Sequence, residues 1–292
     1  MTTQSPTATA AGTIQLGNLT VNRLGYGAMR LTGKGIWGPP DDKAAALATL
    51  RRALELGVNF IDTADSYGPN VSEELIAEAL TPYPAGLVIA TKGGWLRVGP
   101  GQWTHNASPK HLEEAVAGSL KRLRLERIDV YQLHVPDPTV SFDASMETLV
   151  RLQQQGKIRH IALSNVTLEH LERARRIVPI VSVQNRYSFA DREWDYLLDH
   201  CEKNGIAFIP WAPLGQNRLA QDALARVAQQ LGATPLQVAL AWLLQRSSVT
   251  LPIPGTSSLA HLEENIQSAA LRLPDTVFQE LSAVTSPHAS LR

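Results

Sequence analysis

The feature that most constrains this chain is a regular alternation between short hydrophobic runs and amphipathic segments. Eight runs, rich in β-branched residues and each as long as a buried strand, span residues 23–29, 58–64, 87–92, 127–134, 158–165, 180–188, 206–214 and 250–255. Segments with helical periodicity lie between them, as in 41–57, where Leu47, Leu50 and Leu54 share one apolar face. Strands that alternate with helices are typical of a parallel sheet covered by helices.

Local signals at the ends of the amphipathic segments support the helical interpretation. Ser108 before Pro109 predicts an N-cap with proline at the first helical position. Thr234, with Gln237 three residues later, predicts a capping box. A glycine suited to a left-handed C-cap follows three of the segments: Gly57, Gly156 and Gly205.

Eight strand-helix units in one series, without a linker, predict an α/β fold of the (β/α)8 TIM-barrel type, and 292 residues suffice for one. An open doubly wound sheet is the alternative. The segment 13–24 carries Gly17-Asn18 between two alternating runs and predicts a peripheral β-hairpin ahead of the barrel. We expect a flexible tail over 1–12, a single domain over 13–292, and a helix at its carboxyl end.

Charge and cysteine content limit the kinds of partner and the cellular compartment that we expect. The 27 basic residues balance 27 acidic ones, so no net field attracts a polyanion, and nucleic acid is not an expected partner. The one cysteine, Cys201, cannot form an internal disulfide, and the first residues do not resemble a signal peptide. No run approaches the roughly 18 apolar residues of a membrane span. We therefore expect a cytoplasmic protein, and the eight histidines show no metal-ligand spacing.

Four titratable residues fall at the predicted carboxyl ends of consecutive strands, where barrels carry their active sites. Asp62, Lys92 and His134 end the second, third and fourth runs, and Tyr67 lies in the loop after Asp62. Each has a structural alternative: Asp62 as a helix cap, Tyr67 as packing and His134 as a core residue. Lys92 is harder to explain this way, because a buried ammonium needs a carboxylate nearby.

Together these residues suit the reduction of a carbonyl group. A lysine cation lowers the pKa of a neighbouring tyrosine, Asp62 could hold Lys92, and His134 could hydrogen-bond a carbonyl oxygen beside Tyr67. Tyr67 would then protonate that oxygen while a hydride reaches the carbon, which requires a cofactor, because no side chain donates hydride. An isomerase or aldolase that uses Lys92 as a Schiff-base amine is the alternative from the residues alone.

The motifs around these residues resemble those of the aldo-keto reductases over nearly the whole chain. The matching segments are 57–68, 90–94, 131–134, 161–165, 183–188, 209–215 and 253–265. The resemblance implies a TIM barrel that binds NADP(H). It also implies a catalytic tetrad of Asp62, Tyr67, Lys92 and His134, in which Tyr67 is the general acid in reduction and the general base in oxidation.

The resemblance also assigns cofactor-binding positions. Ser164, Asn165 and Gln184 match the groups that bind the carboxamide, and Trp211 matches the aromatic residue that stacks on the nicotinamide. Arg218 is a candidate for the pyrophosphate. Gly255 and His261 stand where many members have Lys and Arg against the 2′-phosphate, so NADP(H) is the expected cofactor and NAD(H) the alternative. The remaining positions are Gly27, Met29, Pro213, Leu214, Gly215, Thr256, Ser257, Glu264 and Asn265.

The loops after the first and third strands suggest an aromatic substrate site built from Trp37, Trp95 and Trp103, with Arg30 nearby. We expect Arg97 to be solvated surface. The segment 33–38 spells GxGxxG, but two prolines follow it instead of a helix, so we expect a flexible loop and no Rossmann site.

Within this family, the segments 21–40 and 254–266 resemble those of the bacterial pyridoxal reductase subgroup. The expected partner is a small carbonyl substrate, with pyridoxal the first choice. A broad aldehyde and ketone reductase, or a sugar or alcohol dehydrogenase, is the alternative. A more remote one is a cofactor-binding regulatory subunit of a potassium channel. The chain predicts no particular oligomeric state.

Overall fold

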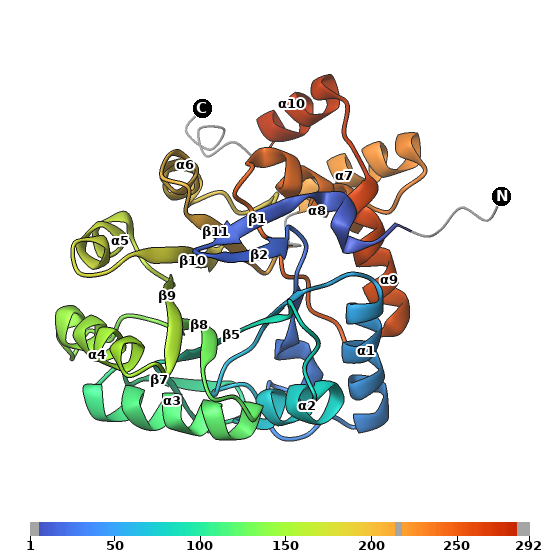
Figure 1. The fold of residues 1–292 in the computed structure, drawn as a ribbon. Coiled ribbons are helices and arrows are strands. Elements are labelled where there is room, and N and C mark those ends of the chain that lie inside the picture. Colours follow the sequence, from blue (N-terminus) through green and yellow to red (C-terminus); the bar gives the residue numbers. More distant parts are fainter. Residues whose placement is uncertain (1–5, 214–217, 285–292) are drawn as a thin grey trace.

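A seven-stranded parallel sheet curls around the centre of the computed structural model, which describes residues 6–213 and 218–284 (Figure 1). Seven of the eight hydrophobic runs supply its strands. In spatial order these are β3 (Tyr26–Gly27), β4 (Phe60–Asp62), β5 (Val88–Gly93), β8 (Ile128–Leu133), β9 (Ile158–Ser164), β10 (Ile180–Arg186) and β11 (Ala207–Trp211). All neighbouring pairs are parallel, as predicted.

The eighth run closes the ring without being a regular strand. On one side the Leu251 N–H donates to the Phe208 carbonyl at 2.9 Å, and on the other the Gly25 N–H donates to the Pro252 carbonyl at 2.9 Å. Pro252 and Pro254 have no N–H to donate, which prevents a continuous ladder here. The sheet is therefore a (β/α)8 barrel, and the open-sheet alternative is wrong.

Helices surround the sheet in Figure 1 and follow the strands along the chain. Their bounds are α1 (Lys43–Glu55), α2 (Val71–Leu80), α3 (Pro109–Leu123), α4 (Phe142–Gln154), α5 (Leu168–Arg175), α6 (Asp195–Lys203), α7 (Arg218–Leu231), α8 (Pro235–Arg246), α9 (Leu259–Gln267) and α10 (Asp275–Val284). The predicted caps are confirmed: the Ser108 side chain accepts from the His111 N–H, and Thr234 forms a capping box with Gln237. The three predicted C-cap glycines have φ of 81°, 77° and 64°.

The predicted hairpin forms, but it is not peripheral. Strands β1 (Thr13–Leu16) and β2 (Leu19–Asn22) lie across the amino end of the barrel in Figure 1. Leu16 and Val21 are fully buried and belong to one apolar cluster with the barrel-lining residue Val130. The hairpin therefore plugs the barrel, because the apolar interior would otherwise open to water at that end.

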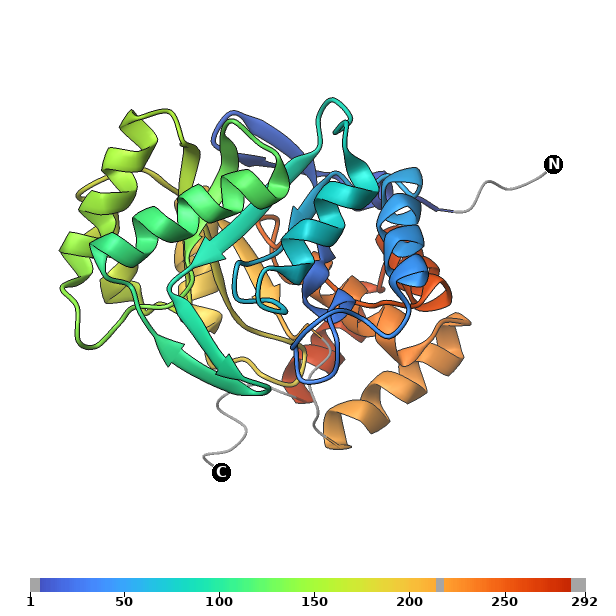
Figure 2. The same cartoon turned by 90° about the horizontal axis from the view of Figure 1, so that it is seen from below.

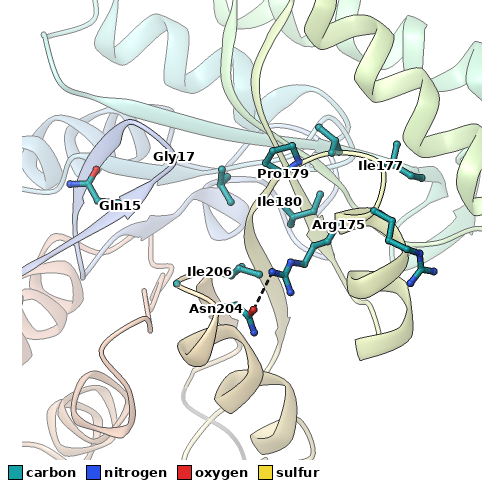
Figure 3. A pocket seen from close by; sticks show the side chains of 12 residues that line it. Gln15, Gly17, Arg175, Ile177, Pro179, Ile180, Asn204 and Ile206 are labelled. Atoms are coloured by element: carbon teal, nitrogen blue, oxygen red, sulfur yellow. Dashed lines mark hydrogen bonds between the residues drawn. The ribbon is translucent and has the colours of Figure 1, made fainter.

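A groove of about 500 Å³ opens beside this hairpin (Figure 3). It lies between the hairpin, the connection 175–181 and the connection 204–206. The Arg175 guanidinium donates to the Asn204 side-chain oxygen at 3.1 Å on its wall. This groove is at the end of the barrel opposite to the predicted active site.

Part of the segment 1–12, which was expected to be a flexible tail, is folded against the core. Residues Ala8–Ala11 form a 3-10 turn, with Ala8 and Ala11 buried against the core. The Ala8 N–H donates to the Leu56 carbonyl at 2.8 Å, so the turn is fastened to the end of α1. Small apolar side chains let the backbone pack closely here, and composition alone does not predict this contact.

The loop after β3 and the connection after β5 lie at the carboxyl end of the barrel. No helix follows 33–38 directly, since α1 begins at Lys43. The connection after β5 folds into an antiparallel hairpin, β6 (Trp95–Gly99) and β7 (Gln102–His105), which was expected to be a loop.

Within the described residues, no helix is long and apolar enough to cross a membrane, and no group of three or more His, Cys, Asp or Glu is placed to hold a metal ion.

Candidate active site

The four residues predicted from strand ends meet at the carboxyl end of the barrel. Asp62 ends β4, Lys92 lies near the end of β5, His134 directly follows β8, and Tyr67 lies in the connection after β4. The Lys92 Nζ is 2.5 Å from the Asp62 Oδ1 and 3.2 Å from the Tyr67 hydroxyl. The Tyr67 and His134 rings meet edge to face, with centroids 5.9 Å apart. None of the four is more than 7% exposed.

Two glutamines complete the surroundings of Asp62. Gln132 and Gln184 each donate from Nε2 to the Asp62 Oδ2 at 2.8 Å, while Lys92 also donates to the Thr63 carbonyl at 2.9 Å. A buried carboxylate bonded on both oxygens is held in one orientation. Sequence reasoning missed Gln132, although its place two residues before His134 on one strand puts it on the same face of the barrel.

Burial and charge set the protonation states of this group. Burial lowers the pKa of Lys92, but the Asp62 charge and hydrogen bond outweigh it, so the pKa is raised and Lys92 stays an ammonium. Burial raises the pKa of Tyr67, and the Lys92 charge only opposes this shift. The expected net lowering of the Tyr67 pKa is therefore wrong for this structure, because the desolvation of a fully buried phenolate costs more than the neighbouring cation returns.

His134 is neutral and has a defined partner on one ring nitrogen. Burial, with a smaller contribution from Lys92, holds the pKa of its imidazole well below the usual value. The Ser66 hydroxyl lies 3.5 Å from His134 Nδ1. If Ser66 donates to Nδ1, the proton of the neutral ring is on Nε2, which makes Nε2 a hydrogen-bond donor. Sequence reasoning missed Ser66, the residue directly before Tyr67.

The three predicted tryptophans lie beside these groups. The Trp95 ring centroid is 6.4 Å from that of His134 and 5.9 Å from that of Trp103, both in edge-to-face contacts. Trp37 comes from the loop after β3, and the Arg97 guanidinium lies over both its ring and that of Trp103. Figure 2 shows the teal β6–β7 hairpin next to the blue loop that carries Trp37. The indole rings therefore form one aromatic wall near Tyr67 and His134.

Arg30 lies beside Gly255. It is exposed in a 3-10 turn, Ala28–Leu31, and its Cγ is 3.6 Å from the place where a Cβ on Gly255 would be. Gly27 and Gly255 face each other across the seam of the barrel, where a Cβ on either would come within 2.6 Å of a backbone oxygen. Glycine is therefore required at both positions for close approach.

Trp211 and Asn165 are joined at the ends of β11 and β9. The Trp211 Nε1 donates to the Asn165 Oδ1 at 3.1 Å. The Asn165 amide in turn donates to the His134 carbonyl at 3.0 Å and the Ser164 hydroxyl at 3.1 Å. Asn165 has φ of 55°, a left-handed conformation that asparagine tolerates. The half-buried indole is thus held at a fixed angle over the barrel mouth.

The predicted phosphate and adenine positions lie along α9 and in the residues just before it. Ser257 and His261 are exposed, Thr256 is buried, and the Glu264 carboxylate accepts from the Thr234 hydroxyl at 2.6 Å. Asn265 is 3% exposed, and its Oδ1 has no hydrogen-bond partner among the described residues. Such an atom suits a ligand with an N–H donor, such as the amino group of adenine, so the residues present fit a dinucleotide.

The other predicted cofactor positions lie partly outside the described residues. Leu214 and Gly215 fall there, and Arg218 begins α7, but its side chain is not described. Pro213 is buried at the end of the connection from β11. Met29 is half-buried, and its carbonyl accepts from the Thr32 hydroxyl at 3.0 Å.

The barrel and this polar cluster at its mouth define an oxidoreductase of the aldo/keto reductase family, and the chain belongs to that family. Its family model matches residues 23–286. The chain is an NAD(P)H-dependent oxidoreductase, so the aldolase and isomerase alternative does not hold.

Relatives of known sequence extend over almost the whole chain. Pyridoxine 4-dehydrogenase of Escherichia coli is 47% identical over 283 residues, which cover 94% of this chain and 99% of that protein. An uncharacterized oxidoreductase of Schizosaccharomyces pombe is 49% identical and covers 94% of this chain and 90% of its own length. These similarities support the pyridoxal reductase subgroup within the family.

Solved structures agree with the fold. A glycerol dehydrogenase from Gluconobacter oxydans superimposes with a TM-score of 0.85 at 25% identity, covering 96% of each chain. A thermostable aldo-keto reductase in complex with epalrestat gives a TM-score of 0.83 at 28% identity, covering 93% of this chain and 99% of that one.

Proposed function

We propose that this protein reduces an aldehyde or ketone to an alcohol, with Tyr67 as the general acid and NADP(H) as the cofactor. The observation that carries the proposal is the position of the Lys92 Nζ, which contacts both Asp62 Oδ1 and the Tyr67 hydroxyl in a buried cluster. A nicotinamide cofactor, when bound, supplies the hydride for the carbonyl carbon. The protein supplies the proton and the orientation of the substrate.

In this proposal Tyr67 carries the proton that the carbonyl oxygen receives. Its raised pKa keeps the hydroxyl protonated at neutral pH before reaction. When the proton leaves, the phenolate is stabilised by the Lys92 ammonium at 3.2 Å, which Asp62 holds in place. In oxidation the same pair lets Tyr67 take the proton back.

His134 orients the carbonyl group. The neutral ring, with Ser66 at Nδ1, leaves Nε2–H free to donate to the carbonyl oxygen beside Tyr67. A hydrogen bond from a neutral donor fixes the oxygen without competing with Tyr67 as the acid. His134 is therefore a positioning donor and Tyr67 the proton source.

We propose that the dinucleotide extends from the barrel mouth to α9. Ser164, Asn165 and Gln184 would bind the carboxamide, with the Trp211 indole against the nicotinamide face. The unpartnered Oδ1 of Asn265 supports an adenine at the far end. Arg30, beside Gly255, supplies a cation where the chain lacks the basic residues of many relatives, which favours NADP(H) over NAD(H).

Pyridoxal is the substrate we propose, with pyridoxine as its product. The 47% identity to pyridoxine 4-dehydrogenase supports this choice. The aromatic wall of Trp37, Trp95 and Trp103 also suits a flat ring that carries an aldehyde. A broad aldehyde reductase remains the second candidate, because an aromatic wall accepts many rings.

A single titration tests the proposal. Purified protein is titrated with NADPH and with NADH while fluorescence is followed, and pyridoxal and then 4-nitrobenzaldehyde are added to the same cuvette. We expect tighter binding of NADPH and its oxidation on addition of pyridoxal. Oxidation with 4-nitrobenzaldehyde alone would favour the broad reductase. Binding of NADPH without turnover of either aldehyde would contradict the reductase proposal and favour a regulatory role.

A further inference from the structure

Arg97 of β6 is half-buried and bonded to backbone oxygens, so it is not the unattached surface side chain that the sequence suggested. A guanidinium has five N–H donors, and each of those of Arg97 has a backbone carbonyl acceptor. Nε donates to Gln102 at 3.3 Å, Nη1 to Ile36 at 2.7 Å and Ser66 at 3.2 Å, and Nη2 to Gly35 at 2.9 Å and Gly99 at 3.4 Å. The donors are therefore fully used.

These bonds connect three segments that are distant in the sequence. They join the loop after β3, at residues 35–36, to the connection after β4, at Ser66, and to the hairpin β6–β7 that carries Arg97 itself. Ser66 directly precedes Tyr67, and its hydroxyl lies beside His134. Arg97 thus links the outer loops to the rim of the catalytic cluster.

The same guanidinium also lies over two indole rings. Its central carbon is 3.9 Å from the ring centroid of Trp103 and 5.7 Å from that of Trp37. A planar cation over an indole face is a favourable contact, and the planar guanidinium suits it better than an ammonium does. Arg97 therefore contacts two rings that come from two different loops.

The charge of Arg97 is not used to bind an acidic group of the protein. Among the described residues, no carboxylate lies within ion-pair distance of it. Because all its donors are bonded to carbonyls, it has none left for an anionic substrate. Its contribution to the site is to hold the surrounding loops in place.

We propose that Arg97 is a positioning residue that fixes the aromatic wall of the substrate pocket and thereby sets the affinity for ring-bearing aldehydes; this rests on the proposed reductase function. Tyr67 depends less on Arg97, because Lys92 and a backbone bond to Ala64 hold it independently. The loop of Trp37 has backbone bonds to Gly68 and Gly101, but among the described residues Arg97 makes the only side-chain hydrogen bonds to it. Loss of Arg97 is therefore expected to raise KM for aromatic aldehydes much more than it lowers kcat.

The test compares Arg97→Lys and Arg97→Gln with the wild type. A lysine offers three donors without a planar face, so neither variant can reproduce five carbonyl bonds and two ring contacts. We expect KM for 4-nitrobenzaldehyde to rise at least fivefold. KM for propanal, which is too small to span the wall, and Kd for NADPH should stay within twofold. Acrylamide should quench the tryptophan fluorescence of both variants more strongly.

Arg23 provides a matched control at the other end of the barrel. Its guanidinium also donates to backbone carbonyls, those of Leu244, Ser247 and Thr250. Arg23→Lys is expected to lower the melting temperature and leave both KM values unchanged. An Arg97 variant with unchanged KM for 4-nitrobenzaldehyde, or with equal rises for both aldehydes, would overturn the proposal. If the wild type reduces neither aldehyde, the reductase function fails instead. Unchanged acrylamide quenching in the Arg97 variants would then by itself refute the positioning role of Arg97.

Discussion

The two ends of the barrel are built from the same strands but have opposite chemistry. At the amino end the interior is apolar, with Phe60, Val88 and Val130 packed under the hairpin β1–β2. Two residues further along β4 and β8 the same face carries Asp62 and Gln132, which are buried but hydrogen-bonded to each other. The groove of Figure 3 opens beside the apolar end, and the catalytic cluster lies at the polar end.

This difference shows how one barrel separates stability from chemistry. Apolar burial at the amino end contributes free energy of folding without any directional requirement. At the carboxyl end, each buried charge or amide needs a partner in the right place, and that requirement fixes the catalytic geometry. Substitutions at the two ends should therefore change different properties.

The largest effect is expected at the polar end. Tyr67→Phe removes the transferred proton, so kcat should fall by about 10²- to 10⁴-fold, in the range of general acid catalysis. The ring stays, and Lys92 keeps Asp62 and the Thr63 carbonyl as partners, so Kd for NADPH and the melting temperature should change little. Steady-state kinetics and cofactor titration measure both.

Tyr83→Phe is the matched control for this prediction. The Tyr83 hydroxyl donates to the Leu123 carbonyl at 2.7 Å, away from the catalytic cluster. Its loss should cost about 1 kcal/mol of stability and leave kcat unchanged. A Tyr67→Phe variant that loses cofactor affinity and kcat in equal proportion would show that Tyr67 is not the proton donor.

The reverse result is expected at the apolar end. Leu16→Ala leaves a cavity in the fully buried plug and should lower the free energy of unfolding by about 2–5 kcal/mol, while kcat at a temperature where the protein is folded stays the same. Denaturant unfolding followed by fluorescence measures the change. Leu19→Ala, at a half-buried site on the paired strand, should cost clearly less. Loss of kcat in folded Leu16→Ala would mean that the two ends are coupled.

The third effect concerns a buried carboxyl at the polar end that the proposed mechanism does not use. Burial, with a smaller contribution from Glu73, raises the pKa of Asp65 to about 8, and its Oδ1 has no hydrogen-bond partner among the described residues. Between about pH 4 and pH 8 the folded state keeps this proton, whereas the unfolded state, with a pKa near 3.9, releases it. Stability should therefore fall as pH rises through this window, by at most about 1.4 kcal/mol per pH unit.

Asp65→Asn should remove this dependence. The stability of the variant relative to the wild type should therefore be higher at pH 8 than at pH 5, and urea unfolding at both pH values measures it. Asp137→Asn is a control of opposite sign. Burial raises the pKa of Asp137, but hydrogen bonds from Thr139 and Ala107 outweigh it and hold the pKa low. Its stabilisation is present at neutral pH and lost on acidification. A pH profile of Asp65→Asn identical to that of the wild type would mean that Asp65 is ionised in the folded protein.

Much of the fold was accessible from local patterns. The strand runs ending at Asp62, Lys92 and His134 were recognisable from length and β-branched residues, and their ends meet in any parallel barrel. The caps at Ser108 and Thr234 depend on bonds to residues three positions away, so sequence alone reveals them. Such features need no knowledge of distant partners.

Other features depended on contacts between distant segments. The five carbonyls around Arg97 come from three connections, and nothing in the local sequence of β6 indicates them. The raised pKa of Tyr67 required the extent of burial, since the effect of the nearby lysine alone has the opposite sign. The turn Ala8–Ala11 likewise became recognisable only by its burial.

Local patterns in the chain predicted the order of the barrel strands and helices, several of the caps, and which four side chains reach the carboxyl end of the barrel. These follow from periodicity and from hydrogen bonds within a few residues. Only the tertiary structure decided that Gln132 and Gln184 bind Asp62, that the hairpin plugs the barrel, and that Arg97 connects three loops. Desolvation and hydrogen bonds between distant segments set these features, and both depend on how the whole chain packs.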